Sequence, residues 1–338
     1  MAEARLLWLP LAASLLIASV LSVTTGPLAI DASDSLRALW ATLTQTQVTS
    51  LQPHEQLVIS NVRLPRTLLA LVIGALLAQC GAVMQGLFRN PLADPGIIGV
   101  ASGAALGAAI AIVIYPEAGA YTTPVAAFLG GLATTFAVYR LAHSRTGTSV
   151  VLLLLSGVAI GALTGSGIGF LTFIANETAL RDLTLWQMGS LASAQWHSIA
   201  ICAAVFVLLA WQFQRQAGSL NALLLGEAEA RHLGIEVEKL KIRLVLLTAL
   251  GVGVTVAAAG MIGFIGLVVP HLIRMLVGPD HRTLLPLSAG LGAAILLVAD
   301  LGARTWMAPA EMPVGLVTAL LGAPFFLALL LSQRHRLG

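Results

Sequence analysis

Apolar residues follow one another along this 338-residue chain in long runs that short polar segments interrupt. Within a run, apolar side chains do not alternate with polar ones, so the runs lack the pattern of barrel strands. About 20 apolar residues cross a bilayer as a helix, which satisfies its own backbone polar groups. The pattern predicts ten membrane helices, near residues 6–26, 65–87, 96–115, 122–142, 149–173, 196–214, 242–261, 263–277, 284–304 and 313–332.

Glycine and proline interrupt the region of the seventh and eighth runs. Gly260, Gly263 and Gly266 break the apolar sequence, and Pro270 lies inside the eighth run. Membrane helices tolerate such residues where neighbouring helices satisfy the freed backbone groups. The boundary between these two helices is therefore left open.

Charge is too scarce to cover a water-exposed surface. The chain is 58% hydrophobic and only 10% charged, whereas soluble domains carry about 25% charged residues. The first run, 6–26, is long for a signal peptide and further spans follow it, so we expect it to be retained. The prediction is an all-α, polytopic membrane protein with one transmembrane domain over residues 1–338.

The distribution of lysine and arginine predicts the orientation. If the N-terminus lies inside, thirteen of the eighteen basic residues fall on the inner side. The five on the outer side are Arg37, Arg63, Arg66, Arg181 and Arg304. The positive-inside rule then places both termini in the cytoplasm and the polar segment 90–95 on the inner side.

Ionisable side chains inside the runs are candidates for function, because charge in lipid is costly. Asp300 and Arg304, near the outer end of the ninth run, can pair along one helix face. No relay of Asp, Glu or His crosses the runs, which counts against an ion-coupled transporter, and no catalytic pair supports an intramembrane enzyme. Walker A, nucleophile-elbow and metal-ligand spacings are missing, so no cofactor or metal is expected in this chain. Cys80 and Cys202 are interpreted as small buried apolar residues.

Several local patterns indicate how helices begin and pack. Asp94-Pro95 is typical of a helix start, with aspartate at the N-cap and proline at the first helical position. Small residues four apart let membrane helices approach closely. Gly103 with Gly107, and Gly161 with Gly165, have this spacing.

Residues 219–236 form a polar segment on the inner side that has helical spacing. Leu220, Leu223 and Leu224 recur with Ala228 and His232 on one helix face. Acidic residues lie near the middle of the segment, and Gly234 supplies a stop. Such a helix suits a protein groove better than an anionic membrane surface, and an ordinary interfacial loop is the alternative.

At this point the chain resembles a known family, the FecCD permeases of type II ABC importers, which take up iron–siderophores, haem and cobalamin. The resemblance runs in order over about residues 55–332. The matching sequences are Arg63-Leu-Pro-Arg66-Thr-Leu, Gly81-Ala-Val-Met-Gln-Gly86, Asn90-Pro-Leu-Ala-Asp-Pro95-Gly, Gly263-Phe-Ile-Gly-Leu-Val-Val-Pro-His271, Asp280-His-Arg-Thr-Leu-Leu-Pro286, Ala299-Asp-Leu-Gly-Ala-Arg304 and Glu311-Met-Pro-Val-Gly-Leu-Val-Thr-Ala-Leu-Leu-Gly-Ala-Pro324.

The resemblance implies a homodimer with a translocation path between its copies, in the bacterial inner membrane. Two cytoplasmic ATPase subunits, which bind ATP and Mg, and one periplasmic substrate-binding protein complete the importer; no nucleic acid takes part. By resemblance to cobalamin permeases, Arg63, Arg66 and Arg304 face glutamates of the binding protein. Residues 219–236 match the coupling helices that contact the ATPase, through Leu220, Leu223, Leu224, Glu227, Glu229, Arg231 and Gly234.

The resemblance also suggests a gate and a cargo. The fifth span and a short outer-side helix at 181–192 would line the gate. Candidates for the pathway and gate are Gln85, Gly165, Gly169, Phe173, Trp186 and Met188. One sequence motif is more similar to haem permeases than to siderophore permeases. It reads Leu180-Arg-x-Leu-Thr-x-Trp-x-Met-Gly-Ser-Leu191. Haem is the expected cargo; a ferric siderophore or cobalamin is the alternative.

Overall fold

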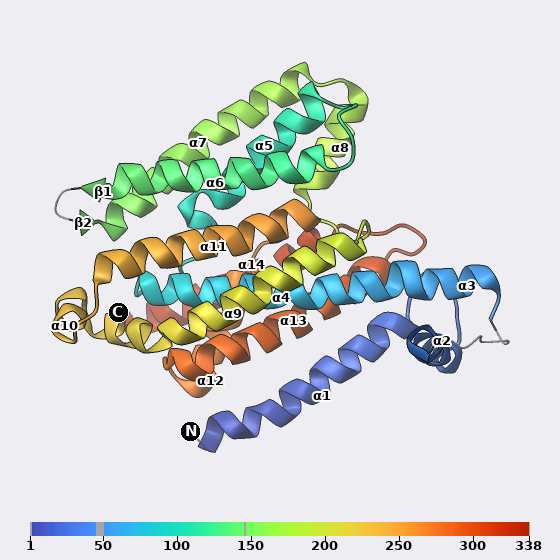
Figure 1. The fold of residues 1–338 in the computed structure, drawn as a ribbon, viewed down its shortest axis with the longest axis horizontal. Coiled ribbons are helices and arrows are strands. Elements are labelled where there is room, and N and C mark those ends of the chain that lie inside the picture. Colours follow the sequence, from blue (N-terminus) through green and yellow to red (C-terminus); the bar gives the residue numbers. More distant parts are fainter. Residues whose placement is uncertain (1, 45–50, 145–146, 338) are drawn as a thin grey trace.

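The computed structural model describes residues 2–44, 51–144 and 147–337 of the chain. Helices make up nearly all of it, and the all-α fold class is confirmed (Figure 1). The α-helices are α1 (Ala2–Thr24), α2 (Ala32–Thr44), α3 (Pro53–Val58), α4 (Leu64–Leu87), α5 (Val100–Ile114), α6 (Thr122–Ala142), α7 (Val150–Ile174), α8 (Glu177–Gln187), α9 (Trp196–Leu225), α10 (Glu227–His232), α11 (Val237–Ala259), α12 (Ile265–Val277), α13 (His281–Thr305) and α14 (Val314–Leu337).

Shorter elements connect some of these helices. A π-helical turn (Ile59–Arg63) joins α3 to α4 without a break, and a 3₁₀ turn (Pro95–Ile98) precedes α5. A small antiparallel hairpin of β1 (His143–Ser144) and β2 (Gly147–Thr148) connects α6 to α7.

Each of the ten expected spans coincides with a helix. Among the described residues, seven helices are long and apolar enough to cross a membrane, including the continuous helix Pro53–Leu87. The other three are shorter apolar helices: α5, α12 and the Val314–Leu329 part of α14. The multi-pass character of the chain is therefore confirmed, whereas the exact number of membrane crossings stays a prediction.

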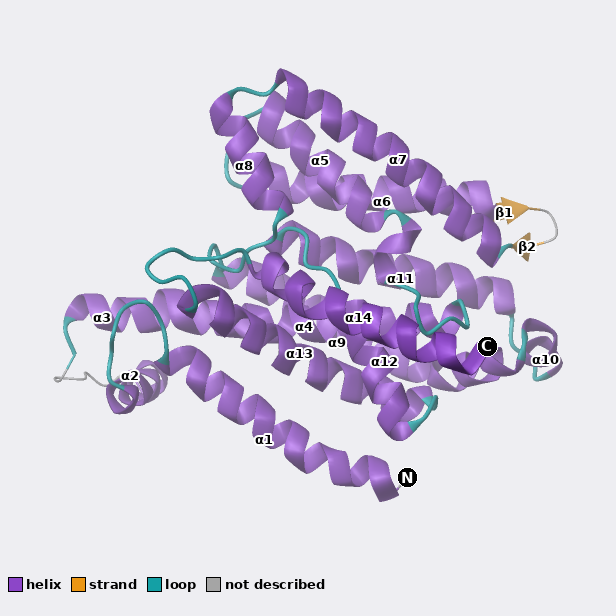
Figure 2. Ribbon diagram, turned by 180° about the vertical axis from the view of Figure 1, so that it is seen from behind, coloured by secondary structure: helices purple, strands orange, loops and turns teal. Residues whose placement is uncertain are grey.

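The helices form two groups. Helices α5 to α8 lie together on one side; on the other, α9 and α11 to α13 pack around the buried helix α4, and α14 packs against α12 and α13 (Figures 1 and 2). Helix α1 runs along α13, and α2 lies beside the extension of α4. Helix α11 contacts α6 and so joins the two groups.

Glycines set how closely helices approach α4. Gly74 faces the backbone of Gly292 on α13, and Gly81 faces the backbone of Gly266 on α12, with no room for a Cβ at either. Gly103 and Gly107 pack against α6 in the same way, which confirms the predicted close approach.

The predicted packing of Gly161 with Gly165 is wrong within this chain. A Cβ added at Gly161, Gly165 or Gly169 meets nothing within 4 Å. These residues leave a face of α7 uncovered, because no other helix in the described part of the chain reaches it.

Some helix boundaries differ from the expected ones for local reasons. Asp94 does act as an N-cap, since its Oδ1 accepts a hydrogen bond from the Gly96 N–H at 2.7 Å. The helix that it starts is only the 3₁₀ turn, because Gly99 at φ +83° ends it before α5 begins. The expected helix 181–192 is α8, which starts at an Asn176 cap and ends before Gly189 at φ +70°.

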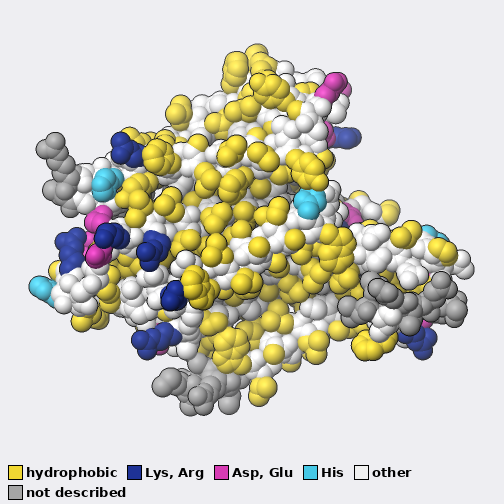
Figure 3. All heavy atoms as spheres, in the orientation of Figure 1, with side chains coloured by type: hydrophobic (Ala, Val, Ile, Leu, Met, Phe, Trp, Pro, Cys, Tyr) yellow, Lys and Arg dark blue, Asp and Glu magenta, His cyan; other side chains and the backbone are white. Residues whose placement is uncertain are grey.

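The expected charge asymmetry is visible in the structure. Basic side chains gather at the end of the molecule that carries α10, while the face formed by α6, α9 and α11 is mainly hydrophobic (Figure 3). Arg145 and the side chains of Arg5, Arg334 and Arg336, which entered the orientation, lie outside the described residues. Cys80 and Cys202 are buried free thiols, as expected.

Candidate functional site

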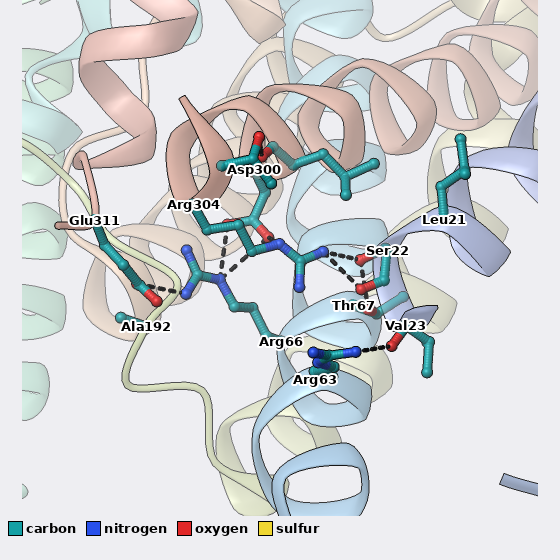
Figure 4. Close-up of polar contacts among 12 residues, drawn as sticks. Leu21, Ser22, Val23, Arg63, Arg66, Thr67, Ala192, Asp300, Arg304 and Glu311 are labelled. Carbon is teal, nitrogen blue, oxygen red and sulfur yellow. Dashed lines mark hydrogen bonds and ion pairs between the residues drawn. The ribbon is translucent and has the colours of Figure 1, made fainter. Parts of the chain in front are cut away.

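Arg66 lies at the centre of a charge cluster at the N-terminal end of α4 and the C-terminal end of α13. Its Nε donates a hydrogen bond to Asp300 Oδ1 at 2.9 Å, and its Nη1 donates to Glu311 Oε2 at 2.7 Å (Figure 4). The Asp300 side chain has no exposed surface, whereas that of Glu311 is 37% exposed. The cluster thus joins α4 to α13 and to the loop that precedes α14.

Arg304 extends this cluster to α1. Its Nη2 donates hydrogen bonds to the carbonyl and the hydroxyl of Ser22, at 2.7 and 2.6 Å. Its Nε lies 3.5 Å from Asp300 Oδ2, which confirms the predicted pair along one face of α13. The Ser22 hydroxyl also bonds Thr67 on α4, so α1, α4 and α13 meet here.

Arg63 stabilises the C-terminal end of α1. Its Nη1 donates to the carbonyls of Val23 and Thr24 at 3.1 and 2.9 Å, and its Nη2 donates to that of Leu28. The Val23 and Thr24 carbonyls are among those that a helix end leaves without partners, and a cation there also complements the helix dipole.

Burial corrects the expected role of the three outer arginines. Arg63, Arg66 and Arg304 are only 3%, 3% and 2% exposed, and all three bond groups of their own chain. In this conformation they hold helices together and do not present a docking surface. The sequence could not reveal this, because the Arg66 partners lie 234 and 245 residues away. Glu311 is the exposed member of the cluster.

Residues 219–236 include the end of α9 and the whole of α10. Gly226, at φ +129°, separates the end of α9 from α10. Leu220 and Leu223 precede this break and are buried in the protein core, at 0% and 2% exposure. They therefore do not face a partner as expected, and Leu224 is half-buried beside them.

The exposed apolar residues of this segment flank α10. Leu225 and Leu233 are 68% and 64% exposed, on either side of a helix whose Glu229 and Arg231 are also exposed. Gly234 ends the helix as predicted, at φ +83°, with its N–H bonded to the Arg231 carbonyl at 2.9 Å. Sequence reasoning missed Leu225 and Leu233, although each stands beside a glycine that ends a helix.

Lys241, at the start of α11, connects this segment to the hairpin. Its Nζ donates to Glu227 Oε2 at 2.9 Å, to Glu238 Oε1 at 3.2 Å and to the Thr148 carbonyl at 2.8 Å. Glu238 in turn accepts a hydrogen bond from the Thr148 N–H at 2.8 Å. The Lys241 side chain is 3% exposed. Sequence reasoning did not single out this lysine; a cation at the start of an apolar run was the available signal.

The six pathway and gate candidates do not share one surface. Gln85 is buried between α4 and α12, where its Nε2 donates to the Leu267 carbonyl at 3.0 Å, so it lines no path. Gly165 and Gly169 lie on the uncovered face of α7, and Phe173 on the same helix is 86% exposed.

The other two candidates lie near α8. Trp186 lines a cavity between α8 and α11, and the Met188 carbonyl faces Gly315 of α14. Among the described residues, no three His, Cys, Asp or Glu side chains gather as metal ligands.

Comparison with known proteins places this geometry in a family. Residues 14–332 match the FecCD transport family. The chain is 48% identical over 306 residues to the hemin transport system permease protein HmuU of Yersinia pestis, covering 89% of each. It is 42% identical over 301 residues to the cobalamin import system permease protein BtuC of Halobacterium salinarum, covering 88% of this chain and 80% of that one.

A solved structure agrees over nearly the whole chain. It is an inward-facing conformation of a metal-chelate type ABC transporter, with a TM-score of 0.84 and 34% identity, covering 97% of this chain and 99% of that one. The chain belongs to the FecCD transport family and is a membrane-embedded permease subunit of an ABC importer.

Proposed function

We propose that this permease carries haem across the inner membrane in an ATP-driven importer. The observation that carries the proposal is the 48% identity, over 89% of both chains, to a hemin transport permease. The segment from Leu180 to Leu191 also supports it, because its sequence resembles that of haem permeases.

The importer that we propose has two copies of this chain, two ATPase subunits and one binding protein. The uncovered face of α7 offers the second copy a surface, because Gly161, Gly165 and Gly169 face open space there. Close approach at small residues is how membrane helices associate. The path would run along this face, with α8 beside it at the outer end.

The ATPase would bind at α10. Leu225 and Leu233 provide exposed apolar anchors, and Glu229 and Arg231 provide charges for specificity. With α10 on the inner side, both termini lie in the cytoplasm, in line with the excess of basic residues at that end.

The binding protein would meet the outer end of the molecule. Glu311 is the accessible member of the arginine cluster there, and its partner Arg66 lies directly beneath it at 2.7 Å. An acidic group of the binding protein would reach Arg66 only by replacing Glu311. Docking of the binding protein would then release the loop before α14 in the same step.

Uptake in liposomes tests the cargo. The permease with its ATPase subunits and binding protein should import hemin, and only when ATP is present. An absorbance titration of the binding protein should show a Soret shift with hemin and no change with a ferric siderophore. Uptake of cyanocobalamin instead of hemin would favour the second candidate, which 42% identity to cobalamin permeases supports.

The same liposomes distinguish a transporter of another class. Uptake by the permease alone, driven by a proton or sodium gradient without ATPase subunits, would contradict the proposed mechanism. We expect no uptake under those conditions.

A further inference from the structure

A large cavity lies between the two helix groups at the outer end of the molecule. Its volume is about 1230 Å³, above the ~300–1,000 Å³ typical of small-molecule sites. It is lined by α5, α6, α8, α9, α11 and the loop between α5 and α6. The path proposed above runs along α7, whose residues do not line this cavity.

The mouth of the cavity lies among helices that face lipid. Val125 and Leu129 on α6 and Ile201 on α9 line it, and they are 54%, 57% and 55% exposed. The surrounding surface of α6, α9 and α11 is mainly hydrophobic (Figure 3). In the membrane, the space is therefore open to the bilayer at this face.

Along α9, the lining changes from polar to apolar with depth. Gln195, His197 and Ser198 line the cavity near the outer end of the helix, and Ile201 and Val205 line it one and two turns further in. A gradient of this kind matches a molecule with a polar head and an apolar tail.

A similar gradient appears along α6, where Tyr121 and Thr122 at its start give way to Phe128 and Leu129 further along the helix. The lining residues of α11 are all apolar, and Leu250 and Val254 form the deep part. Because apolar cavities of this kind do not hold water well, the deep part favours an acyl chain.

The charge at the rim indicates which head group fits. Glu117 and Asp182 line the outer end, and both are exposed carboxylates; Arg181, which does not line the cavity, lies 3.9 Å from Asp182. Tyr115 and Tyr121 stand beside them in the lining, and Tyr121 packs edge-on against the His197 ring at 5.1 Å between centroids. Carboxylates and aromatic rings together attract an ammonium group.

We propose that this cavity binds a bilayer phospholipid with an ammonium head group, such as phosphatidylethanolamine, with one acyl chain between α6, α9 and α11. The lipid fills the space between the two helix groups and keeps their outer ends apart. This site is separate from the transported cargo.

Native mass spectrometry of the delipidated complex of permease and ATPase subunits tests the proposal. Phosphatidylethanolamine and phosphatidylglycerol with identical acyl chains are titrated in turn. We expect phosphatidylethanolamine to bind more tightly by about two- to fivefold, the range that an exposed ion pair supplies. The double variant Glu117→Gln, Asp182→Asn should remove this preference while lipid still binds.

A matched pair of variants tests the acyl site. Ala257→Phe adds a ring to the cavity lining about one turn from Val254, which narrows the space for an acyl chain, and should weaken lipid binding roughly tenfold, the effect of losing about two buried methylene groups. Ala204→Phe, on an exposed face of α9 outside the cavity, should bind lipid like the wild type.

Other outcomes would overturn the proposal. One is equal lipid binding by Ala257→Phe and Ala204→Phe, and another is a preference for phosphatidylglycerol. A third is displacement of the bound lipid by hemin but not by added phospholipid. If Ala257→Phe does not fold, Ile201→Trp blocks the mouth at an exposed position and carries the same expectation.

Discussion

Asp300 lies between two guanidinium groups, and this arrangement explains how three charges can be buried at one point beside the exposed Glu311. Arg66 and Arg304 are neutralised by Asp300 and Glu311, so the cluster carries no net formal charge. Burying charges costs several kcal/mol for each ion, and their mutual attraction offsets this only while every partner is present. The removal of Asp300 would leave two buried cations with one carboxylate.

We therefore expect Asp300→Asn to lower the free energy of unfolding by about 3–5 kcal/mol, the usual cost of removing one partner of a buried ion pair. The loss is measured by unfolding the protein in mild detergent through titration with sodium dodecyl sulfate. The matched control is Asp34→Asn, whose partner Arg37 is 68% exposed at 3.3 Å, and it should cost less than about 1 kcal/mol. Equal losses in the two variants would contradict a structural role for the cluster.

For single residues, the sequence predicted contacts between side chains of one helix but not contacts between side chains of different helices. The Asp300–Arg304 pair follows from a spacing of four residues, and the Asp94 cap follows from the proline after it. The Arg66–Asp300 pair joins distant segments, so no local pattern contains it. Arginines near the end of a span look alike in sequence whether they face a partner or a neighbouring helix.

Close approach at glycine determines how the helices are arranged. Helix α4 is the most enclosed of the span candidates, with 83% of its apolar window buried. It can pack this tightly because Gly74 and Gly81 meet backbone, not side chains, of α13 and α12. Residues along α4 such as Leu69, Ile73 and Leu76 then have no exposed surface.

Gly81→Ala should separate α4 from α12, because the added methyl group would meet the Gly266 carbonyl. Overpacking of this kind costs about 1–3 kcal/mol, measured as the loss of free energy of unfolding in detergent. Gly218→Ala is the control, since its methyl group would have only the Arg282 side chain nearby, at 3.9 Å. That variant should be neutral or slightly stabilising. A Gly81→Ala protein as stable as the control would show that α4 and α12 can separate freely.

Hydrophobic runs predicted where the helices lie more reliably than what they face. The glycine spacing of Gly103 with Gly107 and of Gly161 with Gly165 is the same in sequence, yet the first pair is packed and the second is open. The leucine spacing that suggested one helix over residues 219–236 spans the Gly226 break, which places Leu220 and Leu223 in the core. Whether a helix face is packed or exposed depends on tertiary contacts, which the local sequence pattern does not contain.

For the whole molecule, the question is how movement at the ATPase end reaches the helices beside the path. Helix α10 is the proposed contact with the ATPase, and α7 is the proposed wall of the path. Lys241 connects them, since it bonds Glu227 of α10 and the Thr148 carbonyl in the hairpin that leads into α7. We expect these contacts to transmit a displacement of α10 to the group α5–α8, which otherwise contacts the rest mainly through α11.

Lys241→Met should therefore uncouple ATP hydrolysis from uptake. The variant loses hydrogen bonds to two carboxylates, each worth about 1.5–3 kcal/mol, so we expect uptake per ATP hydrolysed to fall roughly tenfold or more. Basal ATP hydrolysis and copurification of the ATPase should persist, because Leu225 and Leu233 are untouched. The control is Lys239→Met, two residues away, whose 79% exposed side chain pairs with Glu236 at the surface. If Lys241→Met transports with the same uptake per ATP as Lys239→Met, the hairpin does not transmit the movement, and α11 must carry it directly through its contact with α6.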